Sequence, residues 1–509
     1  MSNVNRQQPE HRWTVRVAWA ALVLFALAIG LPGLRSLPID KHEALLIQTS
    51  NEMLARGEWI VPWFNEAPRL NKPPLAYWTA MATHWLRTAG TPSRVEIIDA
   101  RIPALLSMWL IAGLAAWLAG REGGWRTAWL AAAFVIVSPM MAFTSHDGRP
   151  DALYALLVFA GGASMASVLL DTAAGRTDGR DRLKAYGAWL LWGLATLTKG
   201  PHVPLMLAVG LWLYAARTMG WRAAARRMRP VSGVLLIGVV AWPWWWLLEQ
   251  RLGETVVAHS QLGGSLYRPG FAALGKAYRE VLGVGLLFPW FLLIPLYWRE
   301  TRGLLERSAV ARLCAYAYLV PLLLFLLAPQ HRWHYMQPVT GFLAVFLALL
   351  AGHLLARKSW LRIFGRAIWI LLGAILTVNA LTQWFWDDRR FQRQRYMSPL
   401  SAPGVADVPV AATPGIESGF EVAVAHSRHR VSQLEDASAW SEWHARLGPE
   451  CGMVLIYAAE AADWGVDTHS TVLAEWPEFD KTIQARLVGH ACTTVAESYR
   501  AALDRPTAH

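Results

Sequence analysis

The segment "GLPGLRSLPIDKHEALLIQ", residues 30–48, joins the end of a long apolar run to a charged segment. The run, from Val17 to Leu34, approaches the length of about 20 apolar residues that a bilayer-spanning helix needs. It is longer than the apolar core of a usual signal peptide, and no clear small-residue cleavage site follows it, so we expect an uncleaved helix. The turn is followed by four polar or charged residues, Asp40, Lys41, His42 and Glu43. This cluster indicates either anchoring at the membrane surface or a reaction centre.

The composition is that of a polytopic membrane protein. Hydrophobic residues make up 54% of the 509 residues and charged residues only 17%, and many of the 29 Trp lie near the ends of apolar runs, where the bilayer interface favours them. The net charge of +12 is unevenly divided, because residues 384–509 carry 11 Lys and Arg against 17 Asp and Glu. Basic charge therefore belongs to the hydrophobic part, which indicates membrane topology and no nucleic-acid binding.

Eleven apolar runs are candidates for transmembrane helices, and the sequence predicts about 11–13 such helices in all. The runs are 17–34, 101–119, 127–144, 152–170, 185–198, 201–216, 230–249, 281–298, 310–328, 337–355 and 363–384. The fifth and sixth runs are short and meet at "TKGP", so a tight turn must join them.

Lysine and arginine gather on alternate connections between these runs. With the N-terminus inside, the six inside segments carry 22 Lys and Arg residues, whereas the short outside connections carry one each, namely Arg149, Lys199 and Arg332. Because an excess of these residues marks the cytoplasmic side, the pattern predicts that 35–100, 250–280 and the polar tail lie outside.

We expect two parts: a membrane-spanning module, residues 1–384, and a small soluble extracytoplasmic α/β domain, residues 385–509. The short apolar stretch 73–86 would reverse the parity of every later loop if it crossed the membrane, so we expect an interfacial helix there, within the outer loop 35–100. In the tail, the apolar stretches "FEVAVAH" and "CGMVLIYAA" are typical of strands, and the helix-like "ASAWSEWHARLG" lies between them.

The three cysteines divide between the two parts. Cys314 lies in an apolar run and is expected to be a small core residue. Cys451 and Cys492 lie in the tail, where a disulfide and two free thiols both remain open.

The predicted parity brings several polar groups to one face, where each must be paired or functional. Asp40 is either a reactive acid or the N-cap of a helix through "HEALLIQTSNEML", with Glu43 completing a capping box, and the two roles can coexist. In "HDGRPDALY", Asp151 is likewise an N-cap or a functional acid, and Arg149 offers a cation for a phosphate or for the neighbouring acids. Lys199 in "ATLTKGP" is a snorkelling lysine or a ligand for a lipid phosphate.

A fourth polar group comes from "APQHRWHYMQP". It contains His331, Arg332, His334 and Tyr335, which form either an interfacial basic and aromatic belt or a phosphate-binding segment. The four groups are more informative together than any one of them alone.

Together, these motifs resemble a known family. "DKHEALLIQTSNEMLARGEWIVPWFNEAPRLNKPPLAYW" resembles the first outer loop of membrane glycosyltransferases of the aminoarabinose transferase and protein O-mannosyltransferase type, and "GRPDALYALL", "GLATLTKGP" and "HRWHYMQP" follow in the family's order. The match covers about residues 15 to 350. It implies a polytopic GT-C fold and a polyprenyl-phosphate sugar donor. It also implies an active site on the periplasmic side of a bacterial-type inner membrane, and a role in modifying the cell envelope, for example its lipopolysaccharide.

The resemblance also assigns roles to residues. Asp40 matches the first-loop acid implicated in catalysis, and Asp151 matches the second acid of the family pattern. The resemblance implies that Lys72 lies beside the active cavity and that Lys199, Arg332, His334 and Tyr335 bind the donor phosphate. We expect the full set of substrate-binding residues to be Lys72, Tyr77, Arg149, Lys199, His331, Arg332, His334 and Tyr335.

Three positions depart from the family pattern. Lys41 stands where a second acid is common, Glu43 where an arginine is common, and Asn71 where an acid commonly precedes the "KPP" lysine. The altered charges imply that donor or acceptor can differ from aminoarabinose and lipid A. No cofactor is assigned. The need for a divalent cation stays open, because a metal site that used the acid commonly found before the "KPP" lysine would lack that ligand here, where Asn71 takes its place.

The chemistry that follows is sugar transfer from a lipid phosphate to a lipid, glycan or protein acceptor. We expect Asp40 to act as base, Asp151 to support it, and cations to stabilise the departing phosphate, with inversion at the anomeric carbon. The alternatives are an oligosaccharide ligase or polymerase on the same scaffold, and a lipid or sugar transporter or flippase. A transporter favours charges near the bilayer midplane and repeated halves, which the sequence does not suggest.

Overall fold

The computed structural model describes residues 7–138, 143–253, 287, 290–326, 333–357, 395–414, 416–427, 430–466, 470–478, 481–489 and 492–504. The chain divides into two compact units. The membrane unit comprises Met1–Pro32, Leu70–Ala76 and Arg101–Asn379, and the loop–tail unit comprises Gly33–Arg69, Tyr77–Ala100 and Ala380–His509. The predicted division kept the outer loop with the membrane-spanning part, whereas most of that loop groups with the tail.

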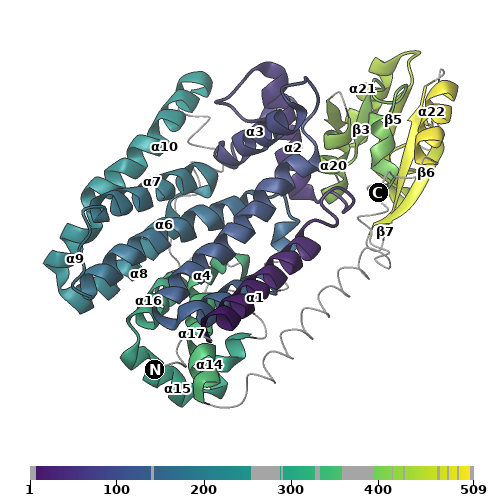
Figure 1. The fold of residues 1–509 in the computed structure, drawn as a ribbon. Helices are drawn as coiled ribbons and strands as arrows, with labels where there is room; N and C mark the ends of the chain where they lie inside the picture. The colour runs from purple at the N-terminus through teal and green to yellow at the C-terminus, as the bar shows by residue number, and fades with distance from the viewer. Residues whose placement is uncertain are drawn as a thin grey trace. The chain divides into compact units, whose positions relative to one another are not determined.

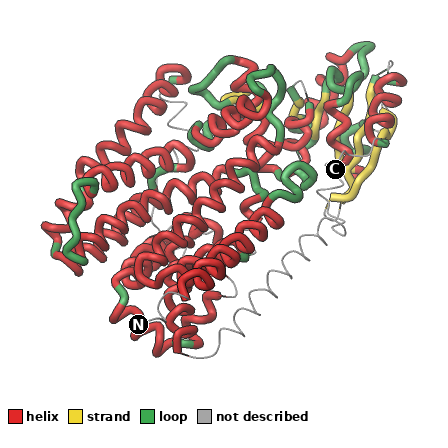
Figure 2. Tube along the Cα trace, in the orientation of Figure 1, coloured by secondary structure: helices red, strands yellow, loops and turns green. Residues whose placement is uncertain are grey.

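In the described part of the membrane unit the regular secondary structure is helical, and turns and loops join the helices (Figures 1 and 2). Its longer helices are α1 (Gln7–Gly30), α4 (Ile97–Ile136), α6 (Pro150–Ala173), α7 (Asp181–Lys199), α8 (His202–Met219), α10 (Pro230–Leu252), α16 (Ala309–Phe325) and α17 (Gln337–Arg357). Its shorter elements are α9 (Trp221–Met228), α14 (Leu293–Leu296), α15 (Trp298–Arg307) and the 3-10 turns η3 (Trp290–Leu292) and η4 (Trp333–Met336).

Several of these helices are long and apolar enough to cross a bilayer. Within the described ranges there are five such stretches, Trp13–Gly30, Ile97–Ile136, Pro150–Ala173, Trp221–Leu252 and His334–Leu355, and a sixth if α15 and α16, bent by 110°, form one broken span. The chain is therefore a multi-pass membrane protein, as its composition predicted. The predicted run 363–384 lies outside the described residues, and so do parts of 127–144, 281–298 and 310–328.

Two predicted helix boundaries coincide with glycines whose φ is positive. Gly124, with φ 68° and ψ −168°, breaks the helical backbone inside α4 and separates the predicted runs 101–119 and 127–144. Gly200, with φ 116°, ends α7 and lets α8 begin at His202, which is the tight turn that "TKGP" predicted.

Close helix packing holds the core of the membrane unit together. A Cβ on Gly161 would lie 2.5 Å from the Trp192 ring, and the Trp192 indole donates to the carbonyl of Val158 at 3.1 Å. A Cβ on Gly210 would lie 2.6 Å from the carbonyl oxygen of Tyr316. Small residues at these positions let backbones approach closely, which is how helices associate in lipid. The result is that α6 is packed against α7, α8 and α17 (Figure 1).

The loop–tail unit combines helices with the strands found among the described residues (Figure 2). The outer loop supplies α2 (Lys41–Arg56), the small hairpin β1 (Trp63–Phe64) and β2 (Ala67–Pro68), and most of α3 (Leu75–Thr88). The tail supplies η5 (Ser398–Ser401), β3 (Val410–Ala412), α20 (Glu417–His426), β4 (Val431–Gln433), α21 (Ala437–Leu447), β5 (Gly452–Tyr457), η6 (Ala458–Glu460), β6 (Ser470–Glu478), β7 (Lys481–Val488) and α22 (Thr493–Leu503).

The tail strands form one mixed sheet in the order β4-β3-β5-β7-β6. The pairs β3–β4 and β3–β5 are parallel, whereas β5–β7 and β6–β7 are antiparallel. The predicted small α/β domain is confirmed, with "CGMVLIYAA" supplying β5 and "ASAWSEWHARLG" supplying α21. A disulfide joins Cys451 to Cys492 across a Cα–Cα distance of 5.1 Å, and Cys314 is a buried core thiol.

The strand-like interpretation of "FEVAVAH" is wrong, because this stretch belongs to α20. The consecutive residues Val422, Ala423 and Val424 are at most 1% exposed. A helix enclosed on several sides needs apolar residues at adjacent positions, so it loses the 3.6-residue period that reveals a surface helix.

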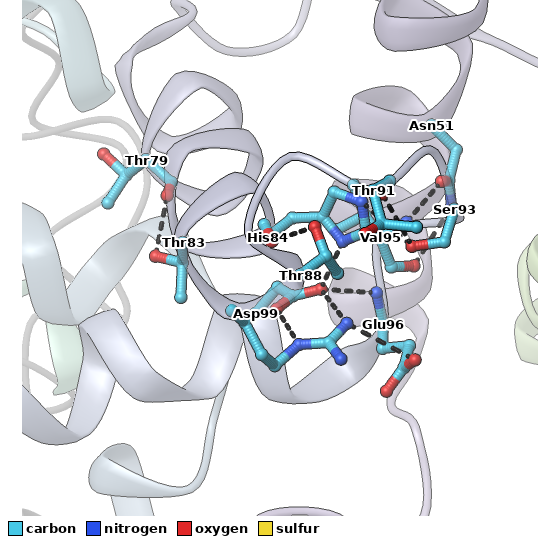
Figure 3. Close-up of polar contacts among 11 residues, drawn as sticks. Asn51, Thr79, Thr83, His84, Thr88, Thr91, Ser93, Val95, Glu96 and Asp99 are labelled. Atoms are coloured by element: carbon cyan, nitrogen blue, oxygen red, sulfur yellow. Dashed lines mark hydrogen bonds and ion pairs between the residues drawn. The ribbon is translucent and has the colours of Figure 1, made fainter.

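A polar network ties α3 to the start of α4 (Figure 3). The buried carboxylate of Asp99 accepts from Arg87 Nε at 2.7 Å and from the Glu96 amide at 2.8 Å, and it lies 3.1 Å from His84 Nδ1. The side chain of Asn51 in α2 makes two hydrogen bonds to the backbone of Val95 beside this network. The predicted helix at 73–86 is thus confirmed as α3, which is not among the candidate spans.

Candidate functional site

The clearest polar site of the membrane unit is an ion pair between two helix ends. Asp151 lies in the first turn of α6, Lys199 is the last residue of α7, and Lys199 Nζ lies 2.5 Å from Asp151 Oδ1. The two side chains are only 20% and 13% exposed. A carboxylate in the first turn of a helix is also favoured by the helix dipole.

The N-cap interpretation of Asp151 is wrong. Arg149 is the N-cap of α6, without a side-chain capping bond, and Pro150 follows it. Proline is favoured at the first helical position because its fixed φ suits the helix and its missing N–H costs nothing there. Asp151 is therefore the second residue of the helix, two positions after the N-cap. Arg149 Nε lies 2.9 Å from Asp147 Oδ2, which confirms its pairing with a neighbouring acid.

Aromatic and polar side chains from three segments surround the ion pair. Lys199 Nζ lies 5.1 Å from the centre of the Tyr335 ring, close enough for a cation–π interaction. A small hollow opens here; it is lined by Asp151, Tyr154, Lys199, His202, Val203, His334, Tyr335, Gln337 and Pro338. The ammonium of Lys199 is therefore part of its polar lining.

Lys72 belongs to the same electrostatic environment. The segment Leu70–Ala76 is part of the membrane unit, and Asp151 interacts electrostatically with Lys72 and His334 as well as with Lys199. The structure thus groups five residues that the sequence predicted, Lys72, Asp151, Lys199, His334 and Tyr335. His331 and Arg332 lie outside the described residues.

Asp40 starts α2 in the loop–tail unit, and its predicted capping role is confirmed. Its carboxylate accepts from the His42 amide at 3.2 Å, and Glu43 Oε2 accepts from the Asp40 amide at 3.0 Å, which completes a capping box. Next to it, Lys41 Nζ lies 2.9 Å from Glu421 Oε1 of α20.

Tyr77 is enclosed in the loop–tail unit. Its ring is 1% exposed, and its hydroxyl accepts a hydrogen bond from the Arg69 guanidinium. Burial raises the pKa of Tyr77, while the charge of Arg69 opposes that rise. The phenol therefore stays protonated over the physiological pH range.

Three polar residues that line the hollow were not predicted. Tyr154, one turn after Asp151 on the same face of α6, donates to the carbonyl of Gly200 at 3.0 Å. His202 follows "TKGP" directly, and Gln337 ends "HRWHYMQ". The sequence did contain signals for them. Tyr154 follows Asp151 at helical spacing, and His202 and Gln337 lie next to or within motifs that had been recognised.

Metal-binding chemistry was left open by the sequence. Within the ranges that the structure describes, His, Cys, Asp and Glu form no group of three or more that could hold an ion. The carboxylates of the site are instead engaged by cations and by backbone amides.

The chain is similar in sequence to known transferases. No protein-family model matches it. It is 28% identical over 392 residues to the undecaprenyl phosphate-alpha-4-amino-4-deoxy-L-arabinose arabinosyl transferase of Pectobacterium carotovorum, a match over 70% of this chain and 64% of the relative. The enzyme of the same name from Edwardsiella ictaluri is 28% identical over 65% of this chain and 58% of its own length. The matches therefore span about three fifths of the length of these relatives.

Solved structures decide the fold. ArnT from Cupriavidus metallidurans bound to undecaprenyl phosphate matches with a TM-score of 0.68 and 17% identity, covering 93% of this chain and 98% of that one. The apo form of the same protein matches with a TM-score of 0.65 and 17% identity, covering 96% and 99%. The chain has the ArnT-like GT-C fold. This ArnT-like fold accounts for both the helical membrane unit and the small tail domain.

Proposed function

We propose that the chain is an integral-membrane glycosyltransferase that moves a sugar from a polyprenyl phosphate to an acceptor hydroxyl. The names of the relatives support this reaction, and a solved structure with the same fold holds undecaprenyl phosphate. We propose undecaprenyl phosphate as the lipid carrier and an amino-deoxy pentose as the first sugar to test. The same similarity supports a transferase over the alternative of a lipid or sugar transporter.

The observation that carries the proposal is the ion pair of Lys199 with Asp151 beside the hollow. Sugar transfer leaves negative charge on the departing lipid phosphate, and a fixed ammonium stabilises that charge best when it needs no reorganisation. An ammonium has three donors, so Lys199 can keep its bond to Asp151 while it binds a phosphate oxygen. Asp151 is then a positioning residue, and Lys72 adds positive charge around it.

Asp40 is proposed as the base. The acceptor oxygen attacks the anomeric carbon, the bond from that carbon to the phosphate oxygen breaks, and its electron pair stays on the phosphate. The acceptor proton passes to the Asp40 carboxylate. A single displacement of this kind inverts the anomeric centre.

We propose that this chemistry takes place on the extracytoplasmic face. The Cys451–Cys492 disulfide lies in the same compact unit as Asp40, and disulfides persist in oxidising compartments such as the periplasm. The loop charges support the same side. Two independent features thus favour one orientation.

The test is a transfer assay with the purified full chain in nanodiscs. Radiolabelled undecaprenyl-phosphate sugars are supplied as a panel with candidate lipid acceptors, and the products are identified by mass. We expect release of undecaprenyl phosphate and a product that gains one sugar. Asp40→Asn and Lys199→Met should lose transfer, whereas Lys481→Met, in the tail, should keep it. A wild-type protein that transfers no sugar from any donor would contradict the proposal.

A further inference from the structure

A short basic helix, α9, lies at one end of the membrane unit. Its sequence, "WRAAARRM", contains three arginines and no acidic residue. Arg227 Nη1 lies 3.5 Å from Asp181 Oδ2, so α9 is beside the first residue of α7, whereas Lys199 is the last residue of α7 (Figure 1). The 19 residues of α7 rise about 28 Å, and the hydrocarbon core of a bilayer is about 30 Å thick. α9 and the Asp151–Lys199 pair therefore belong to opposite faces of the membrane.

The backbone places α9 outside the hydrocarbon core. Gly220, with φ 81°, separates α9 from α8, and Arg229, with φ 53°, separates it from α10. α10 has 23 residues, which is enough to cross a bilayer by itself. The apolar stretch Trp221–Leu252 thus needs only α10 to span, which leaves α9 at the level of the lipid headgroups.

One face of α9 is attached to the rest of the membrane unit. Ala224 and Met228 are buried. The Trp189 indole of α7 donates to the carbonyl oxygen of Met228 at 2.7 Å. The ion pair of Arg227 with Asp181 joins the same two helices. These contacts fix the rotation of α9, so the fold determines which of its arginines are exposed.

The other face of α9 presents a tryptophan and two arginines. Trp221 is 64% exposed, and Arg222 Cζ lies 5.2 Å from the centre of its ring. Arg222 and Arg226 are both exposed, and like charges four residues apart on a helix repel each other. Neither arginine pairs with an acidic side chain in the part of the chain that the structure describes. An anion from outside the chain would remove this repulsion.

We propose that Arg222 and Arg226 bind the headgroup phosphate of an anionic phospholipid, at the membrane face opposite the Asp151–Lys199 pair. Guanidinium groups donate paired hydrogen bonds to phosphate oxygens, and one phosphate between the two arginines offsets both charges. The exposed ring of Trp221 favours a lipid over free phosphate, because tryptophan prefers the boundary between headgroups and acyl chains. The bound lipid then holds α9 against the bilayer.

This site does not depend on the proposed sugar transfer. The loop charges predict that the face of α9 is cytoplasmic, and the negative charge of anionic lipids attracts basic segments at such a surface. The lipid at α9 is therefore a structural ligand, distinct from the sugar donor.

Helix α15 supplies a matched control. Its sequence, "WRETRGLLER", also begins with Trp and Arg, and Trp298 is 56% exposed. Its three arginines are accompanied by two acids, Glu300 and Glu306. Because these acids offset most of the basic charge, we expect α15 to bind an anionic headgroup more weakly than α9.

The test measures thermal unfolding of the purified full chain in a neutral detergent with added phosphatidylglycerol, phosphatidylcholine or inorganic phosphate. Phosphatidylglycerol alone should raise the unfolding temperature, by about 3 °C, because a ligand that binds only the folded state stabilises it. In R222Q/R226Q, the concentration that gives half of this rise should increase at least about tenfold, because two charged hydrogen-bond donors are lost. R302Q/R307Q, which removes the same charge from α15, should keep the wild-type response. Without added lipid, R222Q/R226Q should unfold no earlier than the wild type, which shows that the variant is folded.

Each outcome decides the proposal. A response to phosphatidylglycerol that R222Q/R226Q loses and R302Q/R307Q keeps supports it. Equal responses of the wild type and R222Q/R226Q overturn it, and so does a wild type that phosphatidylglycerol does not stabilise. Equal losses in both double variants indicate a general attraction between charges and also overturn it. An equal response to inorganic phosphate indicates a site for a free anion and overturns the assignment to a lipid.

Discussion

Lys199 Nζ and Asp151 Oδ1 are 2.5 Å apart, although 48 residues separate them in the sequence. The pair joins the end of α7 to the first turn of α6, in a hollow that also contains Tyr335 and His334. Such a pair is costly to break at one side only, because the remaining charge is left without its partner in a poorly solvated place. It therefore serves both the stability of the fold and the binding of an anion.

Removing one charge of the Asp151–Lys199 pair should lower the stability of the membrane unit more than removing both charges. We expect Lys199→Met to lower the stability of the membrane unit by about 2 kcal/mol, less than for a fully buried pair because both side chains keep some exposure. The double variant D151N/K199M should recover part of that loss. Thermal unfolding in detergent measures both, and equal losses in the single and double variants would contradict a buried pair.

At Asp40, the two roles can be separated by choice of substitution. Asn is a good N-cap, so Asp40→Asn should fold like the wild type yet lose transfer. Asp40→Ala should also lose about 1 kcal/mol of stability because the capping bond disappears. Chemical unfolding followed by circular dichroism distinguishes these variants. Equal stability of the Asn and Ala variants would show that the cap contributes nothing.

Features formed by residues close together in the sequence could be predicted, whereas contacts between residues far apart in the sequence could not. The capping box of Asp40 and Glu43 spans three residues, so its local signal was sufficient. For Asp151 the N-cap alternative stayed open beside the functional one, because the preference of Pro150 for the first helical position was not weighed. The pairing of Asp151 with Lys199 depends on tertiary packing of α6 against α7, which no local pattern records. Helix α20 was not predicted, because it is buried on several sides and its sequence therefore lacks the 3.6-residue spacing of apolar residues that reveals a surface helix.

The disulfide of the tail should contribute strongly to stability. Cys451 and Cys492 are 41 residues apart, and closing a loop of that size restricts the unfolded chain by about 4 kcal/mol. We expect C451S/C492S, or reduction with a thiol, to lower the unfolding temperature of the loop–tail unit. Trypsin cleavage within residues 395–504, followed by mass spectrometry, localises the effect. The Cys314→Ser variant, whose thiol lies in the membrane unit, is the control for thiol chemistry.

His426, at the end of α20, should make the loop–tail unit sensitive to acid. Burial, together with the nearby charge of Arg94, lowers the pKa of His426 from 6.5 to about 4. Below pH 6.5 the unfolded chain binds a proton that the folded chain excludes, so stability falls as the pH drops from 6.5 toward 4. Above pH 6.5 both states are neutral at this residue, and its contribution no longer changes.

We expect His426→Gln, which cannot titrate, to flatten the stability profile between pH 6.5 and pH 4, as measured by unfolding at pH 4.5, 5.5 and 7. His444→Gln, on α21, is the matched control, and an unchanged slope in the His426 variant would show that other groups cause the acid sensitivity.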